Sequence, residues 1–212
     1  MRFVFVTTNL AGGGAEKALL KTAAALRTRG HEADIWLLED RITHTIPAGI
    51  AVHALGPRIG HGWLHRRLAA RRLRRGLLSR GPYDLLVSTL PFADEVVHLA
   101  GLPRHWCRIA NTLSAEIGSL SRSRTKKANR RLARYHRLYS AHPLIAVSQG
   151  VADDLRHELQ LQSRIEIIPN PFDASDIAAA AQAVADIPKR PYVIHVGRFA
   201  AQKRHDLLLD AW

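Results

Sequence analysis

A triple-glycine loop near the start of the chain is the first feature whose residue types could serve chemistry. Gly12, Gly13 and Gly14 separate a short apolar segment from a helical pattern, and Glu16 follows. Glycines let the backbone approach a ligand closely, and the free N–H groups of a helix start favour anions. The loop is neither GxGxxG nor a P-loop, whose lysine it lacks. It predicts either an anion-binding turn or a plain tight turn.

A second turn, near the end of the chain, carries two cations. Arg198 directly follows Gly197 after an apolar segment, and Lys203 comes shortly afterwards. An arginine fork combined with a lysine point charge suits a diphosphate group. The alternative is a pair of solvated surface cations.

The remaining reactive side chains form no recognisable catalytic or metal-binding pattern. His61 and His65 have a ligand-like spacing, but no carboxylate lies near them in the sequence. The single cysteine, Cys107, excludes a disulfide framework and is predicted to be a buried, inert thiol. Asp153 and Asp154 are predicted to stabilise the dipole at a helix start. The sequence therefore assigns no catalytic residue, and we expect no metal or other cofactor.

Positive charge is the one unusual bulk property, with a net charge of +13. Two stretches, 42–83 and 117–152, contain no acidic residue. Such patches attract nucleic acid, anionic lipid headgroups or phosphorylated substrates, whereas the plain alternative is a solubilising surface. The cations that we expect to face an anionic membrane are Arg66, Arg67, Arg71, Arg72, Arg74, Arg75, Lys126, Lys127, Arg130 and Arg131.

The elements that must position these residues alternate between strands and helices. Apolar runs predict strands over 3–6, 33–38, 50–55, 83–88, 107–110, 144–147 and 165–168. Helical patterns occupy 18–26, 64–78, 124–139 and 150–159, and Ser148 is a candidate N-cap. The inward residues of the two basic helices are expected to be Leu64, Leu68, Leu73 and Leu77, and Leu132, Tyr135 and Tyr139. This order predicts an α/β fold with a doubly wound, mostly parallel Rossmann-like sheet and helices on both faces.

Domain organisation changes towards the end of the chain. Residues 1–173 are expected to form one Rossmann-like domain, and 174–190 a short helix and linker. Residues 191–212 then restart the pattern, with a buried strand over 192–196 and a helix from His205. Because one strand and a helix cannot form a core, we expect 191–212 to be the opening fragment of a second domain whose remainder is absent.

In combination, these features resemble the family-4 retaining glycosyltransferases of GT-B fold. The resemblance rests on "GGGAEKALLKTAAALRTRGHEADIWLL", on "IAVSQGVADDL" with "IEIIPNPFD", and on "YVIHVGRFAAQKRHDLLLDAW", while the region from about 40 to 140 contributes little. It implies that the first domain binds the acceptor and that the second domain binds the nucleotide sugar. The paired-glutamate motif of the family is expected beyond Trp212.

The resemblance also implies site residues. Gly12, Gly13 and Gly14 would line the cleft beside the donor diphosphate, and Arg198 and Lys203 would neutralise the leaving nucleoside diphosphate without a metal. Many members carry a histidine near the strand at 107–110, but here the nearest one, His105, is expected to precede that strand. The residues that remain as candidate contacts to the acceptor or donor sugar are Glu16, Asn111, Thr112, Ser114 and Ser148.

The implied activity is transfer of a sugar from a nucleoside-diphosphate sugar to a glycan or lipid-linked acceptor, with retention of configuration. Synthesis of bacterial cell-surface polysaccharide or lipopolysaccharide is the expected context. With no apolar run long enough to span a bilayer and no signal-peptide pattern, we expect a cytoplasmic protein, peripheral on the inner face of the plasma membrane. The alternatives are a nucleotide-sugar epimerase of the same fold and a basic nucleic-acid-binding protein. No nucleic-acid-binding motif supports the latter, so we expect no nucleic-acid partner.

Overall fold

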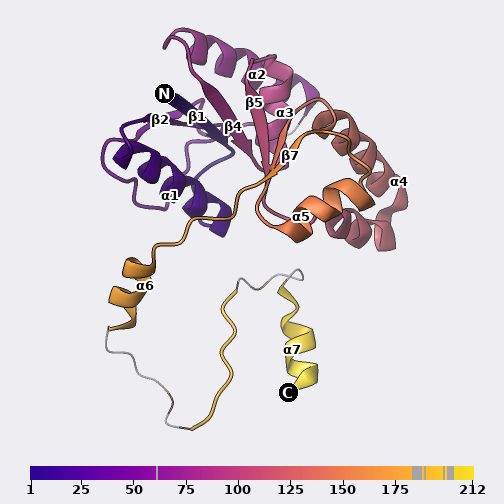
Figure 1. The fold of residues 1–212 in the computed structure, drawn as a ribbon. Coiled ribbons are helices and arrows are strands. Elements are labelled where there is room, and N and C mark those ends of the chain that lie inside the picture. The colour runs from indigo at the N-terminus through magenta and orange to yellow at the C-terminus, as the bar shows by residue number, and fades with distance from the viewer. Residues whose placement is uncertain (61, 183–187, 189, 198, 200–202) are drawn as a thin grey trace. The chain divides into compact units, whose positions relative to one another are not determined.

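The computed structural model describes residues 1–60, 62–182, 188, 190–197, 199 and 203–212, without the side chains of 121–123 and 176. Its first 172 residues form one unit around a seven-stranded, all-parallel sheet with helices on both faces (Figure 1). The predicted doubly wound α/β fold is confirmed. The strands are β1 (Arg2–Thr7), β2 (Glu32–Leu37), β3 (Ala51–Ala54), β4 (Leu85–Thr89), β5 (His105–Ile109), β6 (Leu144–Ala146) and β7 (Ile165–Ile167). The helices of this unit are α1 (Gly14–Thr28), α2 (Trp63–Leu78), α3 (Pro91–Ala100), α4 (Leu113–Tyr139) and α5 (Gln149–Asp153), which runs into a π-helical turn over Asp154–Glu158.

The strand order is β3-β2-β1-β4-β5-β6-β7, so the direction of winding reverses between β1 and β4. The chain first moves outwards from β1 to β2 and β3. Helix α2 then carries it back across the sheet to β4 on the other side of β1. In open α/β sheets, ligands bind outside the carboxyl ends of the strands at such a reversal. The fold therefore directs attention to the loops that follow β1 and β4.

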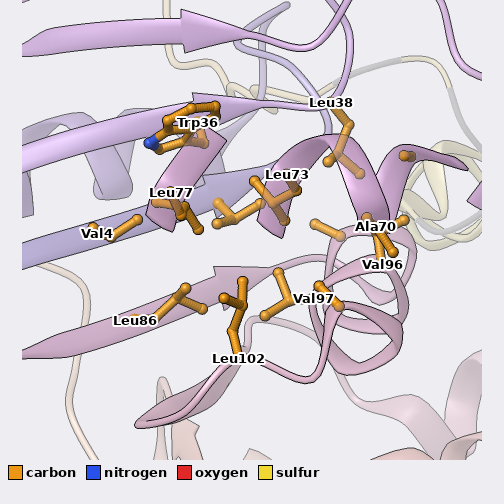
Figure 2. Close-up of a cluster of buried hydrophobic side chains, with 14 of the residues drawn as sticks. Val4, Trp36, Leu38, Ala70, Leu73, Leu77, Leu86, Val96, Val97 and Leu102 are labelled. Carbon is orange, nitrogen blue, oxygen red and sulfur yellow. The ribbon is translucent and has the colours of Figure 1, made fainter. Parts of the chain in front are cut away.

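Helices α2 and α3 cover one face of the sheet with a continuous apolar core. Trp36 and Leu86 on the strands lie against Leu73 of α2 and Val97 of α3, and all four are buried (Figure 2). Helix α1 covers the other face, where Leu19 belongs to a second buried cluster. A third cluster joins β5 and β6 to the second half of α4 and to α5.

Two details of the predicted helices are wrong. In α2, Leu64 and Leu68 are exposed at 63% and 50%, while the buried stripe is Ala69, Ala70, Leu73 and Leu77. The small alanines allow α2 to approach the sheet closely. In the second basic helix, Tyr135 and Tyr139 are buried as expected, but Leu132 is 38% exposed.

The structure also contains helical segments that the sequence patterns did not predict. Helix α3 connects β4 to β5, as parallel neighbouring strands require a crossover. Helix α4 starts at Leu113 and is interrupted at Arg124, where φ is −150° and ψ is 64°. Arg131 beyond this kink forms an ion pair with Glu116 before it, so the two halves of α4 fold back on one another.

Residues 173–212 form a second unit, with α6 (Ala174–Ala181) and α7 (His205–Ala211). The helix predicted from His205 is confirmed. The buried strand predicted over 192–196 is wrong: this segment pairs with no strand in the described part of the chain, and Val196 is 86% exposed. An isolated strand has neither backbone partners nor a neighbour to bury its side chains, and β-propensity alone does not replace them.

Candidate functional site

Three polar side chains form a row across β1, β4 and β5 at the carboxyl ends of these strands. Thr7 is paired in register with Thr89, and Thr89 with Arg108. Within the described part of the chain, the Oγ1 atoms of both threonines and the Nη1 atom of Arg108 are buried without a hydrogen-bond partner. Unpaired buried polar atoms cost free energy, which a bound polar ligand or water can recover. These three atoms therefore form a buried polar row beneath the carboxyl edge of β1, β4 and β5.

The helices that begin at this edge differ in how their N-terminal N–H groups are satisfied. Neither α1 nor α3 has a side-chain cap, and the residue before α3, Leu90, adopts a left-handed conformation with φ of 79°. Uncapped helix starts present free N–H groups and a partial positive charge. Helix α1 follows β1 and helix α3 follows β4, so this edge of the sheet has a partial positive charge that favours an anion.

The other two helix starts at this edge are closed by side chains. Asp154 Oδ2 accepts hydrogen bonds from the backbone N–H groups of Leu113 (2.9 Å) and Ser114 (3.3 Å), and Oδ1 accepts from the Ser114 hydroxyl. The prediction that Asp154 stabilises the start of its own helix is therefore wrong, because it caps α4. Ser148 Oγ accepts from the N–H of Val151 at 3.3 Å, which confirms its predicted capping role in α5.

The triple-glycine loop follows β1 directly. Gly12 has a φ of +93°, a conformation that strongly favours glycine. A side chain at Gly13 would collide with the carboxylate of Glu16, which folds back over that residue at the start of α1. Glu16 thus occupies the place that an incoming anion would take, so an anion must displace this carboxylate to reach the helix start.

A small cavity of about 30 Å³ lies at the ends of β4 and β5. Its walls include Leu90, Arg108 and Asn111, one of the predicted contacts. Arg108 donates a hydrogen bond from Nη2 to Asn170, and partial burial lowers the pKa of its guanidinium. Arg108 thus places a cation in the wall of this cavity.

Beneath this cavity is a buried hydrogen-bond network centred on Asp94 of α3. Asp94 Oδ1 accepts from the Ser88 hydroxyl at 2.5 Å, and Oδ2 accepts from the Tyr139 hydroxyl at 2.9 Å. Burial raises the pKa of Asp94 to about 7, although the hydrogen bonds from Ser88 and Tyr139 oppose the shift. Through these hydrogen bonds the Asp94 carboxyl group of α3 connects β4 with α4 at the small cavity.

Histidines extend the network away from Asp94. His105 Nε2 lies 2.7 Å from Ser88 Oγ. When the Ser88 hydroxyl donates its hydrogen to Asp94, His105 Nε2 must carry a hydrogen and donate it to Ser88 Oγ. The ring of His105 packs against His142, and His142 Nε2 lies 2.8 Å from His98 Nδ1. Burial lowers the pKa of His105 to about 3 and that of His142 to about 4. His105 is the first residue of β5, so the prediction that it precedes this strand is wrong.

The sequence contained a weak signal for this network. Ser88 and His105 lie in or beside apolar runs, where a polar side chain needs a buried partner. Asp94 lies in the helix that the sequence patterns missed, so the partner itself was not identified. Cys107, at 3.5 Å from His105 Nε2, is buried as predicted, and burial raises the pKa of its thiol.

The predicted site residues are distributed over both units. Gly12, Gly14, Thr112 and Ser148 are exposed at the carboxyl edge of the sheet, and Ser114 is engaged by Asp154. Lys203 is an exposed residue of the second unit, and Arg198 lies outside the described residues. The structure therefore does not test the predicted pairing of these two cations with the glycine loop.

The predicted membrane-facing cations also divide into groups. Three make defined contacts: Arg66 with Glu95, Arg131 with Glu116, and Arg74 with the carbonyl groups of Ala100 and Gly101 at the end of α3. The others are exposed: Arg67, Arg71, Arg72, Arg75, Lys126, Lys127 and Arg130. Among the helices that the structure describes, none is both long and apolar enough to cross a bilayer.

No cluster of three potential metal ligands occurs among the described residues. The polar groups at the carboxyl edge of the sheet are the N–H groups of two helix starts, the hydroxyls of Thr7 and Thr89 and the guanidinium of Arg108. Such a set binds and orients an anionic, polyhydroxylated ligand through hydrogen bonds.

Comparison with known proteins gives one family match. Residues 12–176 match the model of Glycosyltransferase Family 4. No curated protein matches the chain.

Several solved structures share the fold. HepE (Alr3699) of Anabaena, crystallised in complex with UDP and glucose, has a TM-score of 0.55 at 22% identity, and the match covers 86% of this chain and 50% of that one. A glycosyltransferase from Rickettsia africae gives 0.53 at 12%, covering 88% and 51%. WaaG, a glycosyltransferase involved in lipopolysaccharide biosynthesis, gives 0.56 at 16%, covering 82% and 46%. The chain thus spans about half the length of these structures, and at such identities the likeness shows the fold alone.

Proposed function

Because the chain belongs to glycosyltransferase family 4, we propose that it forms the acceptor-binding half of a retaining, nucleotide-sugar-dependent glycosyltransferase. The acceptor is a glycan or lipid-linked sugar of bacterial surface polysaccharide or lipopolysaccharide synthesis. The observation that carries the proposal is the carboxyl edge of β1, β4 and β5, where two helix starts without side-chain caps adjoin three unpaired buried polar atoms. These groups suit a ligand that combines negative charge with many hydroxyls.

The leaving group determines what the site must supply. When the bond between sugar and diphosphate breaks, negative charge develops on the phosphate oxygens, and preorganised cations and N–H groups stabilise it. In the proposal, the backbone of Gly12, Gly13 and Gly14 approaches the diphosphate, and Arg198 and Lys203 neutralise it without a metal. Asn111 and Thr112 are proposed to contact the sugars at the end of β5.

The exposed face of α2 supports a peripheral membrane location on the cytoplasmic side. Trp63, Leu64 and Leu68 are 61%, 63% and 50% exposed and recur at helical spacing beside exposed arginines. The guanidinium of Arg67 lies 4.6 Å from the centroid of the Trp63 ring. Apolar anchors flanked by arginines are typical of helices that lie in a membrane interface. We propose that this stripe contacts anionic lipid.

Sugar transfer is the direct test of the proposed function. The protein carrying this chain is expected to transfer a radiolabelled sugar from a nucleoside-diphosphate donor to glycolipid or glycan acceptors, with the anomeric configuration retained by NMR. Residues 1–212 alone are expected to give no turnover. Epimerised nucleotide sugar without any transferred product would instead favour the epimerase alternative, and turnover by residues 1–212 alone would contradict the assignment of this chain to the acceptor half.

Membrane binding gives an independent prediction. Because each cation near an anionic surface contributes about 1 kcal/mol, replacing Arg71 and Arg75 with glutamine should weaken co-sedimentation with phosphatidylglycerol vesicles about 30-fold at low salt. The Trp63→Ala variant should weaken it further through lost insertion. Arg74 is excluded from the test because its contacts with α3 are structural.

The matched control replaces two exposed arginines outside α2 and its core cluster, Arg29 and Arg41. If this control weakens vesicle binding equally, the effect comes from the net charge of the protein and not from the position of the arginines on α2. If the chain does not bind anionic vesicles but binds duplex DNA at the same salt concentration, the membrane proposal is wrong. The nucleic-acid alternative then gains support.

A further inference from the structure

A groove of about 580 Å³ lies between α2, α3 and α4. Pro91 and Glu116 line both this groove and the small cavity at the ends of β4 and β5. The two hollows therefore adjoin one another on either side of these two residues. The charged residues of its lining are Arg66, Glu95, Glu116, Lys127, Arg131 and Arg134.

The carboxylates of the groove hold its arginines in place. Glu95 of α3 lies between two of them, with its oxygens 3.1 Å from Arg66 Nη1 and 3.6 Å from Arg134 Nη1. Glu116 pairs with Arg131 and accepts a hydrogen bond from the Tyr135 hydroxyl at 3.2 Å. Ordered guanidinium groups lose less entropy when they bind a ligand, so the ion pairs preorganise the site.

The two carboxylates neutralise only part of the positive charge in the groove. Four cations face two carboxylates, and each arginine has five N–H donors. Within the described part of the chain, Arg66 Nε is buried without a partner, and Lys127 forms no hydrogen bond or ion pair. The groove thus keeps two positive charges and several N–H donors available.

We propose that this groove binds a phosphate group carried by the acceptor, which makes the acceptor a phosphorylated sugar. The proposal rests on the function proposed above. A phosphomonoester approaches two negative charges at neutral pH, which matches the excess charge, and the planar guanidinium forks bind phosphate oxygens in pairs. The sugar ring attached to this phosphate then lies towards the small cavity at the ends of β4 and β5, past Pro91 and Glu116.

Binding of a sugar phosphate, measured without donor or turnover, tests the proposal. We expect residues 1–212 to bind glucose 6-phosphate more tightly than glucose by calorimetry or by NMR titration, with affinity that falls as salt rises. Lys127→Gln should weaken this binding about fivefold, the scale of one charge-assisted contact at a partly exposed site. Lys126→Gln is the matched control, because Lys126 is an exposed neighbour on the same helix that does not line the groove.

The outcomes separate this inference from the proposed function. Equal affinity for glucose and glucose 6-phosphate, or equal weakening by both lysine variants, would overturn the phosphate site even if sugar transfer is observed. A specific loss in Lys127→Gln would support the site even if no transfer is found. Vesicles containing phosphatidic acid distinguish the source of the phosphate: competition with glucose 6-phosphate that Lys127→Gln abolishes indicates a lipid-linked phosphate in the groove, whereas absence of competition indicates a soluble one.

Discussion

Replacing Asp94 with asparagine is expected to remove one specific loss of stability that the wild-type chain undergoes as the pH rises from 4 to 8. The folded-state pKa of Asp94 is raised from 3.8 to about 7 by burial, so its stabilising contribution is complete below about pH 4 and is lost as the pH rises through 7. This shift corresponds to about 4 kcal/mol of unfolding free energy between pH 4 and pH 8. Asparagine does not ionise, so relative to the wild type the variant should gain about that amount over this range.

Urea unfolding followed by circular dichroism at a series of pH values measures this difference. His105 and His142, whose folded-state pKa values are lowered, act in the opposite direction and destabilise the fold as the pH falls below 6.5. Both histidines remain in the variant, so the difference between the two curves reports mainly on Asp94 and on its coupling to His105 through Ser88. Asp40→Asn, an exposed aspartate, is the control, and parallel curves for Asp94→Asn and wild type would show that Asp94 does not titrate in this range.

Replacing Arg198 or Lys203 with alanine in the protein carrying this chain should lower kcat/KM about 100-fold. The proposed role of both cations is to stabilise the charge that develops on the departing diphosphate, and the loss of one such contact at a reacting centre has roughly this effect. Lys203 is exposed, so the thermal unfolding midpoint of its variant should stay within about a degree of the wild type. Steady-state sugar transfer with varied donor concentration is the measurement.

Arg190→Ala removes an exposed cation from the same unit and serves as the control. If the Lys203 variant has the same kcat/KM as the Arg190 variant, Lys203 does not neutralise the diphosphate. Wild-type kinetics in both the Arg198 and Lys203 variants would mean that the site neutralises its leaving group by other residues.

The fold was predictable from the sequence because buried parallel strands leave continuous apolar runs that glycine and proline punctuate. Helix α3 was missed because it has only ten residues and its polarity does not follow its burial, since Asp94 is buried whereas Leu99 is 38% exposed. Leu64 and Leu68 were assigned inward because leucine is usually buried, whereas the packed stripe uses Ala69 and Ala70. The strand expected over 192–196 failed because a strand depends on its neighbours, which a local pattern cannot supply.

The candidate site was only partly predictable. The glycine loop is contiguous in sequence, and its position between a strand and a helix was sufficient to identify it. The Asp94 network combines β4, α3, β5 and α4, and Tyr139 reaches Asp94 across 45 positions. Asp154, likewise, caps a helix that begins 41 positions earlier. Such contacts depend on how the chain folds back, so no local spacing reveals them.

The strand order also determines how the chain can fold during synthesis. Strand β1 gains its first neighbour, β2, by residue 37, but its other neighbour, β4, is complete only at Thr89. Until then, one edge of β1 is open, with unpaired backbone groups that can bind another unfinished chain. Because long-range parallel pairing is slow, the order of the sheet makes aggregation of nascent chains a risk before α2 carries the chain back across β1.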